Sequence, residues 1–238
     1  MKRSRDMEKR SEISSAIEEL SMMVIVKPDG NHEVAHIPIK PFLSLCHLVL
    51  QVIDKVGPSM AVLRQDVHLN IKKLEVMYES NPSMNSNLVE ILKSEASNGT
   101  SRKRCSCSKA FVWLTRSLDF SSKLLQGLAN DPKNNMKQIV EESYAETLAP
   151  WHGWISSAAS KVALKLVPDD KTFMDLLREK DGNCDTLKEK MQKLTSLMVP
   201  FLEDIHSIIV RLVSCFLTNK DIKFITWTGL SQLEVKIE

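Results

Sequence analysis

The sequence predicts an all-α protein, on three observations. Apolar residues recur at helical spacing through most of the 238 residues. Seven glycines and two tyrosines are few for a chain of this length, which argues against a β architecture with many turns. Eleven methionines, with abundant leucine and valine, suit helices with an adaptable interior. The chain is long enough to bury a sizeable core in one packed unit.

The first half of the chain divides into helices separated by turn and proline signals. Apolar spacing begins at Ile13, and a turn follows at Lys27–Asn31. The next breaks are Gly57–Pro58, where Pro58 suits the first turn of a helix, and Asn81–Pro82. The helices predicted between these breaks cover residues 13–25, 41 to about 56, 58–78 and about 85–96.

The second half continues the same pattern after a polar loop that ends at Ser106. Asp131–Pro132 and Pro168 mark turns, and Pro200 is expected to kink the last helix. The predicted helices cover residues 107–129, 134–148, about 150–166, about 170–180 and 184–217. Residues 218–238 show no helical period and indicate a strand or disorder.

Composition excludes several classes of function. The net charge of +2 gives no electrostatic case for nucleic acid binding. No run of eighteen apolar residues occurs, so we expect no membrane span, and the basic N-terminus lacks the apolar region of a secretory signal. Five cysteines without a disulfide pattern indicate a reducing compartment, hence a cytosolic protein. Cys105 and Cys107 lack zinc-ligand spacing, so we expect neither metal nor cofactor.

Five polar and aromatic residues form a set suited to a sugar. Asp66, Asn70 and Lys73 fall at i, i+4 and i+7 of a predicted helix, which places them on one stripe. Trp113 stands in a second apolar run, and His152 lies between two tryptophans. Hydroxyl groups need acceptors and donors, and the C–H side of a sugar ring needs a flat aromatic face. Taken singly, each of these residues also fits a solvated helix face or an ordinary core position.

Taken together, and in their order along the chain, these residues resemble the motifs of the glycolipid transfer protein family. The resemblance covers residues 38–217, which we take as the domain, with 1–37 as a partly helical N-terminal extension and 218–238 as an atypical tail. It implies a two-layer sandwich of about eight helices that holds one sphingolipid. The motifs are Asp66-x-x-x-Asn70-x-x-Lys73, Trp113-Leu114-x-Arg116-x-Leu118 and His152-Gly153-Trp154.

The resemblance also implies a role for each of these residues. Asp66 would accept from the ceramide amide and sugar hydroxyls, and Asn70 and Lys73 would bond further hydroxyls. Trp113 would stack under the sugar, and His152 would donate to the ceramide amide carbonyl. Trp154 and Ile155 would touch the membrane. Our candidates for the pocket that keeps the lipid chains dry are Phe42, Leu45, Leu48, Val49, Val52, Phe111, Leu148, Leu164 and Ile205.

We therefore expect a non-enzymatic carrier of a simple glycosphingolipid such as a monoglycosylceramide. A carrier of ceramide phosphate is the first rival: Asn70 and Trp113 argue against it, and Lys109 favours it. A lipid sensor is the second rival, favoured by Ser160, which stands where the family has an apolar residue, and by the atypical tail. A sphingolipid-modifying enzyme is the third rival, and the sequence shows neither the paired acid and base nor the metal signature that it would need. Ile39–Leu43 faintly resembles a segment by which relatives bind an endoplasmic-reticulum anchor protein.

Overall fold

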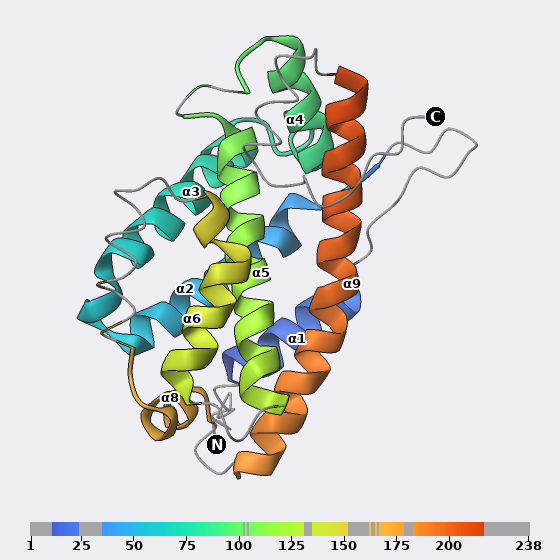
Figure 1. Ribbon diagram of the computed structural model, residues 1–238. Helices are drawn as coiled ribbons and strands as arrows, with labels where there is room; N and C mark the ends of the chain where they lie inside the picture. The colour runs from blue at the N-terminus through green and yellow to red at the C-terminus, as the bar shows by residue number, and fades with distance from the viewer. Residues whose placement is uncertain are drawn as a thin grey trace, which may run out of the picture.

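The computed structural model describes residues 11–23, 35–101, 103, 105–130, 135–151, 162, 165, 167–178 and 183–216. Over these residues the chain is helical, which confirms the predicted all-α class (Figure 1). An isolated antiparallel bridge joins Pro38 and Asn87. The helices are α1 (Glu12–Met22), α2 (Ile39–Val56), α3 (Ala61–Ser80), α4 (Leu88–Ser97), α5 (Cys107–Asn130), α6 (Met136–Thr147), α8 (Asp170–Leu177) and α9 (Cys184–Phe216), with 3-10 turns η1 (Pro58–Met60) and η2 (Ala149–Trp151).

The helices form two layers, as the family resemblance implied. In Figure 1, α5, α6 and α9 run side by side in front, and α1, α2 and α3 cross behind them. Helix α5 is central, because it contacts α3, α6 and α9. Phe42 of α2 and Phe111 of α5, both fully buried, connect the layers with 5.0 Å between their ring centroids. The buried apolar side chains of both layers belong to a single core.

Helix α1, from the predicted N-terminal extension, packs on the domain. It lies against α2 and α9, and its Ile13, Ala16 and Leu20 are buried in the common core. Lys55 of α2 donates to the Glu12 carboxylate at 2.5 Å and also to the Leu176 carbonyl at 3.2 Å. The lysine therefore connects the start of α1 and the end of α8 to α2.

Asn87 fixes where α4 begins and how the chain enters α2. Its Oδ1 accepts from the backbone N–H groups of Val89 and Ile37, both at 3.0 Å, and its Nδ2 donates to the Ala35 carbonyl at 3.1 Å. An asparagine at this position satisfies one of the unpaired N–H groups of a helix start. Because its other bonds reach a segment fifty residues earlier, the same side chain also holds the two segments together.

The element boundaries differ from the sequence prediction in a few places. Pro58 opens a separate 3-10 turn, and α3 begins only at Ala61. The predicted helix 184–217 matches α9, which ends at Phe216 and contains Pro200. Most of the predicted helix 150–166 and all of the tail 218–238 lie outside the described residues.

Gly127 marks a close approach between α5 and α6. A Cβ added there would lie 2.5 Å from Cγ2 of Ile139, a buried and stiff β-branched side chain. We expect Gly127→Ala to lower the free energy of unfolding by about 1 kcal/mol, because overpacking outweighs the gain in helix propensity. Chemical denaturation measures this, with Gln126→Ala on the exposed face as control. A Gly127→Ala protein as stable as its parent would contradict the close packing.

Candidate functional site

Helix α3 presents the first three predicted site residues at one edge of its buried face. Val67 and Ile71 are buried, and Asn70 is 5% exposed beside them, whereas Asp66 is exposed and Lys73 half-buried. Asn70 donates from Nδ2 to the Asp66 carbonyl at 3.0 Å and accepts from Lys73 Nζ at 3.2 Å. The helix thus gathers a carboxylate, an amide and an ammonium group, which together can accept from and donate to hydroxyl groups.

The start of α5 is fixed by Glu95 of α4. The Glu95 carboxylate accepts from the backbone N–H groups of Cys107 and Ser108, both at 2.8 Å, and from the Ser108 hydroxyl at 2.5 Å. A carboxylate at a helix start satisfies unpaired donors and complements the helix dipole. Burial, reinforced by Glu95, raises the pKa of the Cys107 thiol to about 12, so this cysteine is a poor nucleophile.

Trp113 stands on α5, the helix that packs against α3. The two helices are in contact and run in opposite senses (Figure 1). Near one end of the contact between these helices, the Cys107 thiol lies 3.9 Å from the Lys73 carbonyl. Further along, Val67 of α3 and Ser117 of α5 both line an apolar cavity. The predicted platform and the predicted α3 residues therefore stand on two helices that pack against each other.

Arg116 adds a contact that sequence reasoning did not assign to the site. Its guanidinium carbon lies 5.0 Å from the Trp113 ring centroid and 4.5 Å from the Trp151 ring centroid. Burial lowers the pKa of Arg116 to about 10, against the opposing effect of the Asp119 carboxylate. The side chain therefore remains charged near neutral pH. The i, i+3 spacing of Trp113 and Arg116 was visible in the sequence, but the approach of Trp151 was not.

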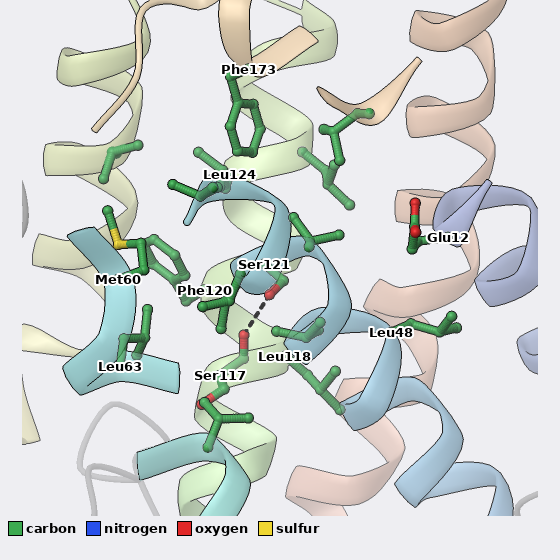
Figure 2. Close-up of a pocket in the computed structure, with 18 of the residues that line it drawn as sticks. Glu12, Leu48, Met60, Leu63, Ser117, Leu118, Phe120, Ser121, Leu124 and Phe173 are labelled. Carbon is green, nitrogen blue, oxygen red and sulfur yellow. Dashed lines mark hydrogen bonds between the residues drawn. The ribbon is translucent and has the colours of Figure 1, made fainter. Parts of the chain in front are cut away.

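An apolar cavity of about 240 Å³ lies between the layers (Figure 2). Helices α1, α2, α3, α5, α6, α8 and α9 all contribute to its wall. Ser117 and Ser121 also line it, but their hydroxyls donate to the α5 carbonyls of Trp113 and Ser117, at 3.0 and 2.8 Å. Glu12 at the wall is paired with Lys55. With its polar groups satisfied in this way, the cavity suits hydrocarbon.

Five of the predicted pocket residues line this cavity: Leu45, Leu48, Val49, Val52 and Leu148. Three others, Phe42, Phe111 and Ile205, are fully buried in the packed core and are not part of the cavity wall. The sequence missed several contributors from the other helices, because their apolar spacing does not distinguish a cavity wall from solid core. Among them are Ile13, Leu63, Val67, Leu118, Leu124, Met136, Val140, Phe173, Leu177, Leu194 and Met198.

The remaining predicted residues have no described place. His152, Trp154, Ile155 and Leu164, together with Ser160, lie outside the described residues. The segment that resembled an anchor-binding motif, Ile39–Leu43, is described. Its apolar side chains Ile39, Phe42 and Leu43 are buried, so they belong to the core and are not exposed for a partner.

The described residues contain no group of three or more His, Cys, Asp or Glu side chains able to hold a metal ion. None of the helices in this part of the chain is long and apolar enough to cross a membrane. Burial also raises the pKa of the Cys46 thiol far above its ordinary value, so neither buried cysteine is activated. The described arrangement offers binding groups rather than reactive ones.

Comparison with known proteins places these features in a family context. Residues 37–179 match the family model described as glycolipid transfer protein. The chain is 49% identical over 212 residues to glycolipid transfer protein 2 of Arabidopsis thaliana, covering 88% of this chain and 95% of that protein. It is 50% identical over 207 residues to glycolipid transfer protein 3 of the same organism, covering 84% and 89%.

A solved structure agrees with this match. It is described as showing how FAPP2 selects simple glycosphingolipids using the GLTP fold. The two chains are 27% identical with a TM-score of 0.75, over 87% of this chain and 96% of that one. The architecture of two helical layers is therefore shared with this structure.

Filling the cavity tests whether it receives hydrocarbon. Val49 lines the cavity, and the larger indole in its place would fill part of it. We expect Val49→Trp to weaken binding of a long-chain alkyl fluorescent probe by about tenfold or more. Gln51→Trp, on the exposed face of α2, is the matched control and should bind the probe as the parent does. Unchanged affinity in Val49→Trp would mean that the probe binds elsewhere.

Proposed function

This chain belongs to the glycolipid transfer protein family, and on that premise we propose that it moves a monoglycosylceramide between membranes without catalysis. The observation that carries the proposal is the apolar cavity, whose wall includes the two helices, α3 and α5, that present Asp66, Asn70, Lys73 and Trp113. Family membership supports sphingolipid transfer; the choice of a neutral, singly glycosylated headgroup rests on the side chains.

The cavity would lower the main energetic cost of carrying a ceramide, which is the exposure of its hydrocarbon chains to water. A ceramide has on the order of thirty methylene groups, and at about 0.8 kcal/mol each their exposure to water costs about 20–25 kcal/mol. A carrier must replace the bilayer with an equally dry surface during transfer. The cavity provides that surface, because its serine hydroxyls are bonded back to the helix that carries them.

The polar residues would then select the headgroup. In this proposal Asp66 accepts from the ceramide amide and a sugar hydroxyl, while Asn70 and Lys73 bond further hydroxyls. The indole of Trp113 supports the C–H face of the sugar, and His152 donates to the amide carbonyl. Unpaired polar groups at a pocket mouth are penalised, so a lipid without a sugar leaves this set unsatisfied.

Membrane docking and location complete the proposal. Trp154 and Ile155 would insert at the membrane surface, where amphipathic aromatic side chains are favoured. Contact of this kind is weak and reversible, as a carrier requires. The free thiols of Cys46, Cys105, Cys107 and Cys184 support a reducing, cytosolic location. The proposal needs no endoplasmic-reticulum anchor protein, since the segment that suggested one is buried.

Carriage of ceramide phosphate is the alternative that a specific residue favours. Lys109 stands one helical turn before Trp113 and would add a second cation to Lys73. Against this, Asp66 repels a phosphate, and Asn70 is neutral. A transfer assay with donor vesicles of glucosylceramide, galactosylceramide or ceramide phosphate decides between them. We expect faster transfer of the two glycolipids; transfer of ceramide phosphate alone would overturn the proposal, and binding without transfer would indicate a sensor.

The stacking platform can be tested by removing its ring. Trp113→Ala should slow glucosylceramide transfer by at least about tenfold, because the sugar loses its aromatic support. Trp113→Phe keeps a smaller ring and should retain more transfer. Circular dichroism of both variants should show the parent's helical content, since Trp113 is only half-buried. Transfer by Trp113→Ala at the parent rate would exclude Trp113 as the platform.

Headgroup preference should respond to charge at the same two positions. Asn70→Lys combined with Trp113→Arg replaces neutral contacts by two cations that can pair with a phosphate. The double variant should therefore prefer ceramide phosphate over glucosylceramide in competitive vesicle transfer. Asn70→Gln combined with Trp113→Phe is the neutral control. A double cationic variant that keeps the glycolipid preference would show that these residues do not face the headgroup.

A further inference from the structure

The guanidinium group of Arg116 contacts two indoles that come from different parts of the chain. Trp113 lies one turn before it on α5, and Trp151 lies in η2 after α6. Its centroid distances of 5.0 and 4.5 Å are within the range of cation–π contacts. Arg116 is 7% exposed, and a cation so far removed from water needs compensation of this kind.

We propose that Arg116 is a positioning residue that fixes Trp113 and Trp151 relative to each other and thereby sets the headgroup preference of the lipid site. The inference rests on the proposed function, because it concerns how the same site is held. Arg116 itself is not placed against the lipid. It affects headgroup preference through the two indole rings that it contacts.

The position of this stack connects the headgroup residues to the cavity. On α5, the two residues after Arg116 line the cavity; they are Ser117 and Leu118. On the other side, the backbone N–H of Trp151 donates to the carbonyl of Leu148, and Leu148 also lines the cavity. Trp151 directly precedes His152 in the chain. A single side chain therefore braces the helix with the platform against the turn that leads into the histidine segment.

A carboxylate on α5 also favours the charged form of Arg116. Asp119, one turn after Arg116 on α5, opposes the lowering of the Arg116 pKa through its negative charge. Asp119 in turn lies 3.1 Å from His206 Nε2 of α9. The guanidinium is thus in contact with two aromatic rings, and its charge is favoured by a carboxylate that is itself paired with another helix. Such multiple support favours one fixed arrangement of Trp113.

The positive charge of Arg116 affects which lipid headgroup the site prefers. In this proposal the ligand uses the face of the Trp113 indole that is turned away from the guanidinium. That face is already polarised by a cation, so a quaternary ammonium headgroup gains little cation–π energy there and is repelled by Arg116. A sugar ring carries no charge and avoids this repulsion. At this indole the stack therefore favours an uncharged sugar ring over the trimethylammonium group of phosphocholine.

Vesicle transfer of glucosylceramide and of sphingomyelin by Arg116 variants of the full chain tests the inference. Arg116→Met removes both the charge and the planar group; we expect it to slow glucosylceramide transfer by about tenfold and to reduce discrimination against sphingomyelin. Arg116→Lys keeps the charge and should retain that discrimination while losing part of the rate. Lys123→Met, which removes a cation of the same helix paired with Glu146, should leave both quantities unchanged.

A double-mutant cycle covers the case in which Arg116→Met fails to fold. Trp151→Leu removes one partner of the stack, and together with Arg116→Lys it should show a smaller combined loss than the two single losses predict. Additive losses, or equal losses for both lipids in Arg116→Met, would overturn the positioning role and reduce Arg116 to general stability. A parent protein that transfers no glycolipid would contradict the proposed function instead, so the two failures are distinguishable.

Discussion

The packing of α3 against α5 supports both parts of the proposed site. Val67 and Leu118, one from each helix, line the apolar cavity, and Asn70 and Trp113 belong to the same two helices. A shift of one helix by a single turn, about 5.4 Å, would move the amide relative to the indole and also change the cavity wall. Glu95 stabilises the start of α5 and so helps to fix this register. Chain binding and headgroup recognition thus depend on a shared contact.

The cavity volume indicates how the fold must respond to a lipid. At about 240 Å³ it is smaller than the roughly 300–1,000 Å³ typical of ligand pockets. Two full hydrocarbon chains therefore require the surrounding helices to move apart. The wall is suited to such movement, because it is shared among α1, α2, α3, α5, α6, α8 and α9 and includes the flexible side chains of Met60, Met136 and Met198. The Lys55 contacts with Glu12 and with the Leu176 carbonyl connect three of these helices and would have to adapt as the cavity widens.

Much of the fold and part of the site could be predicted from the sequence. Apolar spacing and proline breaks located the helices, and the i, i+4, i+7 spacing placed Asp66, Asn70 and Lys73 on one stripe, since both patterns depend on local geometry. Spacing could not separate Leu45, in the cavity wall, from Phe42, in solid core, because that difference is set by which helix packs opposite. Arg116 was missed for a related reason: arginine is rarely buried, and the approach of Trp151 that compensates its burial is a tertiary contact.

The central claim is that one lipid occupies the cavity with its headgroup at the α3–α5 pair. A crystal structure of the chain with bound glucosylceramide tests it most directly. The account predicts hydrocarbon in a widened cavity beside Leu118 and Val49, and the glucose ring over Trp113 within hydrogen-bond distance of Asp66 and Asn70. A lipid bound on the outer surface, or a sugar remote from Trp113 with the chains in the cavity, would contradict it.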